Sequence, residues 1–175
     1  MKTLKFPELH QVYNWDCGAS AMQSVLTYWG FDVREEVIMK VAKTSSRGTQ
    51  IVGMKAVAKK FGLVVKSGTM TIGDIKKFLD RKIPVVLLIQ AWSGKKRIKW
   101  ENDWLDGHYV VAIGYSQRRI YFEDPWTFSR TFLTLRELEK RWHDVDRDKK
   151  KHFNWGLAAW LKNKKTKNKN IKHLD

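Results

Sequence analysis

Residues 11–30, QVYNWDCGASAMQSVLTYWG, contain the single cysteine of the chain and place it at the predicted start of a helix. After Cys17, apolar residues recur at helical spacing at Met22, Val25, Leu26 and Trp29. Gly30 is a suitable C-terminal cap, so the pattern predicts a helix over 17–29. A thiol at a helix N-terminus lies at the positive end of the helix dipole, which favours the reactive thiolate. A lone cysteine is more often a small buried hydrophobic residue, so its role depends on partners elsewhere in the chain.

The composition predicts one folded domain. The chain has 175 residues, of which 43% are hydrophobic, and nine are tryptophan. This length allows a substantial hydrophobic core, and no stretch approaches the roughly 20 apolar residues of a membrane span. The N-terminus has no continuous apolar segment typical of a secretory signal, so we expect a cytoplasmic location. One cysteine allows no internal disulfide and no paired cysteine ligands, and we expect neither a metal nor another cofactor.

The net charge of +16 requires nucleic acid to be considered as a partner. Part of this charge lies in 162–175, KNKKTKNKNIKHLD, which contains six lysines and one aspartate. We expect this lysine-rich tail to be disordered and the folded domain to span 1–161. The body has no zinc-finger spacing, no glycine-rich phosphate loop and no RNA-recognition motif. The charge would also steer an acidic segment of a peptide or protein substrate toward the domain, while the oligomeric state stays open.

The hydrophobic periodicity changes from helical to strand-like along the chain. Helical patterns occupy 17–29, 34–42, 51–61 and 72–82, and a helix over 135–142 follows a capping box of Thr134 and Glu137. Strand patterns occupy 63–65, 83–92, 108–115, 119–123 and 155–161. The run over 83–92 is almost continuously apolar, as in a strand buried on both faces. The order predicts an α+β fold, with an N-terminal helical half packed on a C-terminal antiparallel β-sheet.

A histidine and an aspartate stand at the ends of two neighbouring predicted strands. His108 begins one strand after Gly107, and Asp124 ends the next strand before a proline. If a three-residue loop joins these strands, Asp124 lies opposite Val110 and on the same face as His108. Diagonal neighbours on one face are about 7–8 Å apart, within reach of an imidazole–carboxylate hydrogen bond. The sheet would then present an oriented histidine to Cys17, with His108 as base and Asp124 as orienter.

Gln11 supplies a candidate oxyanion donor six residues before Cys17. Its side-chain amide, with the backbone N–H of Cys17, could stabilise charge that develops only in the transition state. Each of these residues has an ordinary structural explanation when taken alone. His108 could be a strand-end histidine, Asp124 a turn residue and Gln11 a surface side chain. Their order on a helix start and on adjacent strands favours the catalytic interpretation.

Two segments that carry these residues match the active-site motifs of a known family. The first is QVYNWDCGA at 11–19, and the second is GHYVVAIGY at 107–115 with EDP at 123–125. They resemble the bacteriocin-processing, double-glycine leader cysteine peptidases, a papain-like group, as does the segment 48–62. The resemblance covers about 8–126. It implies a papain-like fold with Cys17 as nucleophile, His108 as base, Asp124 as orienter and Gln11 in the oxyanion hole.

The chain also differs from the best-known members of that family, which are fused to a membrane exporter and an ATPase. It more closely resembles stand-alone relatives, so double-glycine specificity is left open. The segment 93–107 looks longer than in the exporters, and its Trp100 and Trp104 are either a lid over the cleft or surface packing. The remaining candidates for the substrate cleft serve helix-start electrostatics or steric clearance: Asp16, Gly18 and Gly107.

The sequence therefore predicts a cysteine peptidase, a thiol hydrolase that cleaves a peptide bond through a thioester acyl-enzyme. Three alternatives stay open. One is a non-catalytic peptide-binding module on the same fold. Another is an acyl or peptidyl transferase that passes the thioester to an amine instead of water. The third is a basic nucleic-acid-binding protein, supported by charge and by tryptophans interleaved with lysines around 92–104.

Overall fold

A computed structural model describes residues 2–162, and the predicted lysine-rich tail lies, from residue 163 on, outside the described residues. The helices are α1 (Cys17–Tyr28), α2 (Glu35–Ala42), α3 (Ile51–Lys60), α4 (Ile72–Asp80) and α5 (Leu135–Arg141), with a 3-10 turn, η1, at Trp100–Asn102. The strands are β1 (Lys2–Thr3), β2 (Val64–Thr69), β3 (Val85–Gln90), β4 (Gly107–Tyr115), β5 (Arg119–Glu123), β6 (Thr131–Thr134), β7 (His143–Val145), β8 (Lys151–Phe153) and β9 (Trp155–Trp160).

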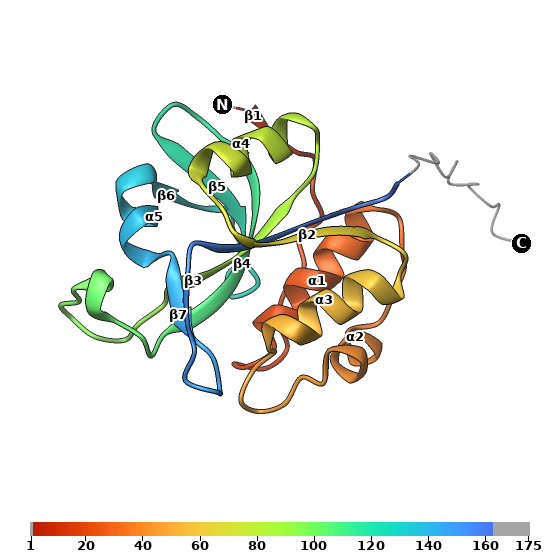
Figure 1. Ribbon diagram of the computed structural model, residues 1–175, viewed down its shortest axis with the longest axis horizontal. Coiled ribbons are helices and arrows are strands. Elements are labelled where there is room, and N and C mark those ends of the chain that lie inside the picture. The colour runs from red at the N-terminus through yellow and green to blue at the C-terminus, as the bar shows by residue number, and fades with distance from the viewer. Residues whose placement is uncertain (1, 163–175) are drawn as a thin grey trace, which may run out of the picture.

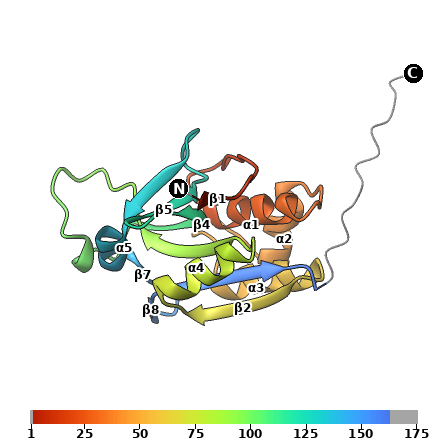
Figure 2. The same ribbon diagram turned by 90° about the horizontal axis from the view of Figure 1, so that it is seen from above.

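The predicted α+β class is confirmed. One antiparallel sheet has the order β2-β9-β3-β4-β5-β6, with β1 added beside β4, and β7 and β8 form a separate hairpin. Figures 1 and 2 show α1, α2 and α3 grouped on one side of the sheet and α5 on the other. Because β3 and β4 are the central strands of the sheet, the residues at their ends lie at the boundary between the helices and the sheet.

The sheet is covered on both faces, which explains the unbroken apolar run of β3. Val86 and Leu88 pack in a core with α1, α2 and α3, whereas Val85, Leu87 and Ile89 pack in a second core with α4 and α5. Successive strand residues point to opposite faces, so a strand between two helical layers has no polar positions to spare. The expectation of a doubly buried strand is confirmed, although α4 and α5 covering the second face was not foreseen.

Local side-chain and glycine signals mark the helix ends, among them the predicted capping box of Thr134 and Glu137. Thr71 forms a capping box with Asp74 at the start of α4, and Thr134 forms one with Glu137 at the start of α5. Gly62, after α3, has a φ of 70°, a conformation that favours glycine. The strand predicted at 63–65 is wrong in length, because β2 continues to Thr69 in pairing with β9.

The β4–β5 hairpin reaches the predicted register by an unforeseen route. Tyr115 pairs with Ile120, so the connecting turn is one residue longer than expected. A bulge between Ala112 and Gly114 then restores the register, and Val111 pairs with Glu123. A side chain at Gly114 would collide with β1, whose Lys2 carbonyl oxygen lies 2.5 Å from the position of a Cβ atom. Continued by one residue, the pairing places Asp124 opposite Val110.

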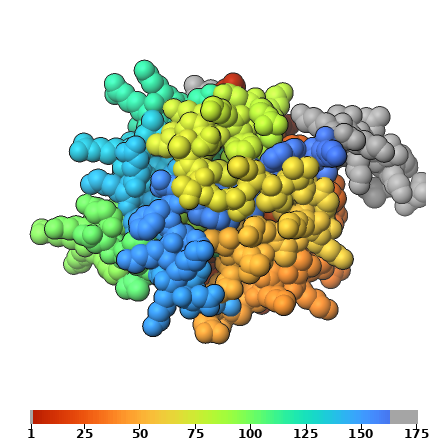
Figure 3. All heavy atoms as spheres, in the orientation of Figure 1, coloured from red at the N-terminus to blue at the C-terminus, as the bar shows by residue number. Residues whose placement is uncertain are grey.

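The segment between β3 and β4 extends from the body of the molecule and includes η1. Figure 3 shows it in green, projecting at the left edge. No helix among residues 2–162 is long and apolar enough to cross a membrane.

Candidate active site

The fold brings Cys17 and His108 together although they are far apart in the sequence. Cys17 is the first residue of α1 and is half-buried, and His108 is the second residue of β4 and is buried. Helix α1 packs against β4, so the N-terminus of the helix meets the beginning of the strand. Cys17 and His108 line the same pocket, and Cys17 contributes to raising the pKa of His108.

His108 forms a short hydrogen bond with Asp124 on its other side. The distance from His108 Nε2 to Asp124 Oδ1 is 2.7 Å, and both side chains are buried. Burial acts to lower the pKa of His108, but the hydrogen bonds to Asp124 and Cys17 and their negative charges outweigh it and raise that pKa to about 9. Burial acts to raise the pKa of Asp124, yet its hydrogen bond and ion pair with His108 lower it. The geometry therefore favours a charged imidazolium–carboxylate pair at neutral pH.

Three further donors, none predicted from the sequence, hold the Asp124 carboxylate. The indole Nε1 of Trp92 donates to Oδ2 at 3.0 Å, and the backbone N–H of Trp126 donates to Oδ1 at 3.0 Å. The hydroxyl of Thr131 donates to Oδ2 at 3.4 Å. Trp92 reaches this position from a φ of 57°, just after β3. Asp124 is thus fixed from several directions before it orients His108.

The loop that carries Gln11 is organised by Asp16. The fully buried Asp16 side chain makes no capping hydrogen bond to α1 and instead accepts the backbone N–H groups of Val12 and Tyr13 through Oδ2, at 3.2 and 3.0 Å. Gln11 Nε2 donates to the Tyr13 carbonyl oxygen at 2.6 Å. Asp16, predicted beside the substrate cleft, is thus fully buried, and its side chain supports the Gln11 loop from inside.

The segment that leads into Gln11 is anchored to the same region as Asp124. The backbone N–H of Leu9 donates to Glu123 Oε1 at 2.9 Å, and that of Gln11 donates to the Pro125 carbonyl oxygen at 3.0 Å. Arg130 pairs with the buried Glu123 carboxylate. These contacts flank Asp124 on both sides in the sequence, so the position of Gln11 is coupled to that of Asp124.

Two pockets meet at Cys17. The first, of about 230 Å³, is lined by Gln11, Cys17 and His108 together with Trp92, Leu105, Asp106, Gly107 and Trp126; we name it the His108 pocket. The second, of about 260 Å³, is lined by Cys17, Thr49, Gly107, Tyr109, Asp144 and Arg147 but by neither Gln11 nor His108; we name it the Tyr109 pocket. Cys17 and Gly107 line both, so the cleft continues past the sulfur in two directions.

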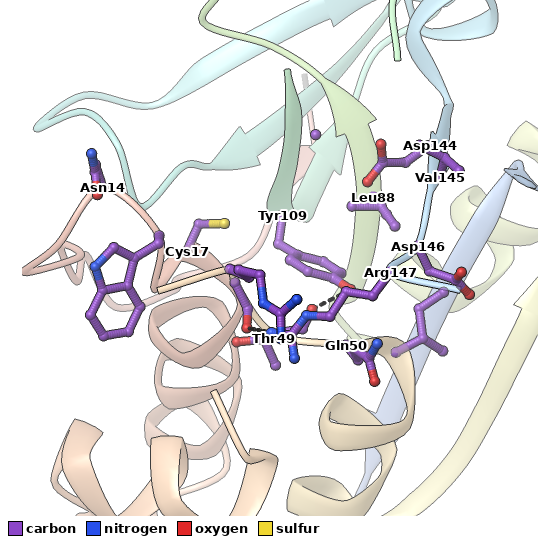
Figure 4. Close-up of a pocket in the computed structure, with 15 residues that line it drawn as sticks. Asn14, Cys17, Thr49, Gln50, Leu88, Tyr109, Asp144, Val145, Asp146 and Arg147 are labelled. Carbon is purple, nitrogen blue, oxygen red and sulfur yellow. Dashed lines mark hydrogen bonds between the residues drawn. The ribbon is translucent and has the colours of Figure 1, made fainter. Parts of the chain in front are cut away.

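Figure 4 shows the Tyr109 pocket, with Cys17 at one end and Asp144 and Asp146 on the opposite wall. Asp144 comes from β7, and its Oδ1 accepts a hydrogen bond from Gln90 Nε2 at 2.9 Å. A Cβ atom on Gly107 would collide with Asp144 Oδ2, so only glycine fits at this first position of β4. Arg147 donates to the Gly48 carbonyl oxygen at 2.5 Å and thereby joins the β7–β8 hairpin to the loop before α3.

Three further residues predicted to line the cleft lie elsewhere. Gly18 is buried against Thr49 and Tyr109, where a Cβ atom would come within 2.7 Å of Thr49 Cβ. The space beside Gly18 is therefore occupied by these side chains and is not open to a substrate. Trp100 packs under the Arg141 guanidinium at 3.9 Å, and Trp104 packs on His143 at 4.4 Å. The two tryptophans line neither pocket, so their surface-packing interpretation fits and the lid does not.

The Tyr109 pocket also contains residues that the sequence analysis did not select. Asp144 and Arg147 belong to the β7–β8 hairpin, a highly charged segment without strand-like alternation. Thr49 also lines this pocket, and its carbonyl oxygen accepts a hydrogen bond from the buried Tyr109 hydroxyl at 3.1 Å. Among residues 2–162, no group of three or more His, Cys, Asp or Glu side chains is arranged to hold a metal ion.

Residues 5–145 match the Peptidase C39 family. Over 136 residues, or 77% of the chain, it is 23% identical to the pediocin PA-1 transport/processing ATP-binding protein PedD of Pediococcus acidilactici. The match covers 17% of that protein, so the chain spans less than a fifth of the relative's length.

Solved structures of low sequence identity share the fold. A double glycine motif protease from an AMS/PCAT transporter, in complex with the leader peptide, superposes with a TM-score of 0.66 at 19% identity, over 90% of this chain and 92% of that one. A putative C39-like peptidase from Bacillus anthracis gives a TM-score of 0.66 at 15% identity, over 91% and 97%. The chain belongs to the Peptidase C39 family, whose members are cysteine-type peptidases.

Proposed function

We propose that this chain hydrolyses a peptide bond through a thioester on Cys17. The observation that carries the proposal is the continuous arrangement of Cys17, His108 and Asp124, in which a buried histidine interacts with the thiol on one side and the carboxylate on the other. A buried imidazole held near a pKa of about 9 would be protonated at neutral pH and so pair with a thiolate. A binding module has no need for this charged pair.

In the ion pair, His108 already holds the Cys17 proton, and in the acylation step the Sγ thiolate attacks the carbonyl carbon of the scissile bond. The bond from carbon to nitrogen then breaks, and His108 returns the proton to the leaving amine. Water, activated by the same histidine, cleaves the thioester and releases the acyl product. Asp124 receives the Nε2 hydrogen bond, which leaves Nδ1 for the exchange with sulfur.

The oxyanion formed by this attack needs donors near the start of α1. The Asp16 side chain does not cap this helix, so the backbone N–H of Cys17 is available to the oxyanion. Gln11 Nε2 carries two N–H groups, of which one is donated to Tyr13, and we assign the second to the oxyanion. Removing such a donor typically lowers the rate by about 10²–10³.

We propose that the substrate is a peptide whose leader segment ends in two glycines. The relatives named above include processing proteins and a double glycine motif protease bound to a leader peptide. In this chain, the close approach of Asp144 to Gly107 narrows the cleft beside Cys17, which favours small residues there. The net charge of +16 further favours an acidic segment elsewhere in the leader.

The proposal is tested with a synthetic peptide that contains one Gly-Gly pair, whose products are identified by mass spectrometry. We expect cleavage directly after the second glycine and a transient mass increase on Cys17. Cys17→Ala should retain the melting temperature and lose both signals, and it should no longer react with iodoacetamide.

Three results would contradict the proposal. Unchanged cleavage by Cys17→Ala would show that Cys17 is not the nucleophile. Tight peptide binding without any product would identify a binding module. Exclusive transfer of the acyl group to added amines, with no hydrolysis product, would identify a transferase.

A further inference from the structure

We infer that the His108 pocket binds the residue that follows the scissile bond and selects an apolar side chain there. This inference rests on the proposed function and extends it to the leaving-group side of the cleft. Three features of the site support it: the path of the proton from His108 to the leaving amine, the side chains that form the pocket walls, and the charge inside the pocket.

The proton transfer decides which pocket the leaving group occupies. When the bond from carbon to nitrogen breaks, the nitrogen must lie within hydrogen-bond distance of His108 to accept its proton. His108 lines the first pocket together with Gln11 but does not line the Tyr109 pocket. The leaving amine and its side chain therefore enter the His108 pocket, and the acyl part extends into the Tyr109 pocket.

The walls of the His108 pocket include three large apolar side chains that face solvent. Leu105 is 83% exposed, Trp92 is 51% exposed and Trp126 is 49% exposed. Exposed apolar side chains that converge on one cleft typically mark a binding surface. A substrate side chain placed among them would remove apolar area from water on both partners.

The carboxylate that orients the histidine holds the indole of one wall, Trp92, and the backbone of another, Trp126. Trp92 donates its indole N–H to Asp124, and the backbone N–H of Trp126 donates to the other oxygen. A pocket with rigid walls loses little conformational freedom when it is filled, which strengthens selection. The selectivity would thus be built on the same frame as the catalytic geometry.

The charge in the pocket disfavours an acidic residue at this position. Among its lining residues, Asp106 is the acidic one and no lysine or arginine is present. Hydrogen bonds from Ser93 and Lys95 lower the pKa of Asp106, so it stays ionised. Lys95 Nζ lies 3.4 Å from Asp106 and 2.8 Å from Asp103, so one lysine is shared by two carboxylates and offsets part of this charge, which reduces the attraction for a basic side chain.

The test uses the reverse of the leaving-group step, so that the natural sequence is not needed. An acetyl-Gly-Gly thioester acylates Cys17, and amino-acid amides then compete with water. The amine nitrogen attacks the thioester carbonyl, its bond to carbon forms, the bond from carbon to sulfur breaks, and the amine proton passes through His108 to the thiolate. Leucine, phenylalanine, glycine, lysine and aspartate amides are compared by the ratio of aminolysis to hydrolysis.

We expect leucine and phenylalanine amides to capture the acyl group about tenfold more efficiently than glycine amide, with aspartate amide the poorest acceptor. Leu105→Ser should reduce this preference at least threefold. Val52→Ser is the matched control, because Val52 is 64% exposed on α3 and lies outside both pockets; its preference should equal that of the wild type.

Equal capture of all amides, a preference for lysine or aspartate amide, or an unchanged preference in Leu105→Ser would overturn the inference while the acyl-enzyme still supports the proposed function. A protein that forms no acyl adduct on Cys17 would refute the proposed function and this inference with it.

Discussion

The indole N–H of Trp92 donates to Asp124 Oδ2 at 3.0 Å, while the other carboxylate oxygen accepts from His108. Trp92 follows the central strand β3, and Asp124 follows β5, so the hydrogen bond joins two strand ends at the site. Trp92 thus bonds the carboxylate that bonds His108, and we expect it to act as a positioning residue.

Trp92→Phe should therefore lower kcat about tenfold and lower the melting temperature by several degrees. Phenylalanine keeps most of the apolar ring but loses the donor, and a hydrogen bond to a charged group contributes about 1.5–3 kcal/mol. The matched control is Thr131→Val, because its contact with Asp124 is longer, at 3.4 Å, and should cost less than threefold. Steady-state kinetics check both variants, and a wild-type kcat in Trp92→Phe would refute the positioning role.

The pKa of His108 predicts the alkaline side of the activity profile. A pKa raised to about 9 keeps the imidazole protonated through neutral pH, so activity should fall as pH rises through about 9. Since the unfolded pKa is about 6.5, the stabilisation from His108 is fully present below pH 6.5 and is lost as pH rises toward 9. Peptide cleavage measured against pH checks the first statement, and urea unfolding at pH 6 and 9.5 checks the second.

His108→Ala is the control for that profile. It should remove the inflection near pH 9 from the profile of the residual cleavage activity, because the proton that titrates there belongs to His108. An inflection that persists in the variant would assign the proton to another group.

Much of this arrangement could be predicted from local sequence signals. Helix α1, the doubly buried β3 and both capping boxes follow from periodicity and from side chains that bond their own backbone. The His108–Asp124 relationship depended on a register, and that register was reached because a bulge near Gly114 compensates for a longer turn. Nothing in the local pattern of β5 indicates this compensation.

The remaining features depend on tertiary contacts. Trp92 contacts Asp124 from a positive φ, which periodicity does not predict. Asp16 has the residue type and position of a helix cap, but its carboxylate bonds the preceding loop. The β7–β8 hairpin was missed because its polar sequence has no apolar alternation, although its Asp144 lines the Tyr109 pocket.

Gly18 should be intolerant of even a methyl group. In Gly18→Ala the Cβ atom would lie 2.7 Å from the buried Thr49 Cβ, so Thr49 and the neighbouring Tyr109 must move. Overpacking of this kind costs about 1–3 kcal/mol, part of which is offset by the better helix propensity of alanine. Gly73→Ala in α4 is the control, because the nearest atom lies 3.5 Å away, and it should be neutral or stabilising.

Thermal unfolding and peptide cleavage of the two alanine variants check this prediction. Gly18→Ala should also lose activity, because Gly18 adjoins Cys17 and Tyr109 adjoins His108. Equal melting temperatures for the two variants would show that the helix start can relax away from Thr49.

Glu35 should make the stability of this protein fall as pH rises. Burial raises the pKa of Glu35 to about 7, with further contributions from the negative charges of Asp16 and Glu36. Its Oε1 and Asp16 Oδ1 are buried without hydrogen-bond partners among the described residues, so a carboxyl proton is favoured there. The folded state therefore binds this proton more tightly than the unfolded state, whose ordinary value is about 4.5.

Because the folded state binds the proton more tightly, the free energy of unfolding should decrease as pH rises from 4.5 to 7, a range in which the unfolded state has already released the proton. Glu35→Gln removes this titration and keeps the shape of the side chain. Relative to wild type, the variant should gain about 1–2 kcal/mol in urea unfolding between pH 5 and 8, a range that allows for solvent screening of a half-exposed group. Glu36→Gln is the matched control, because the exposed neighbouring carboxylate should show a smaller change. A constant difference between Glu35→Gln and wild type across this range would mean that Glu35 is ionised throughout.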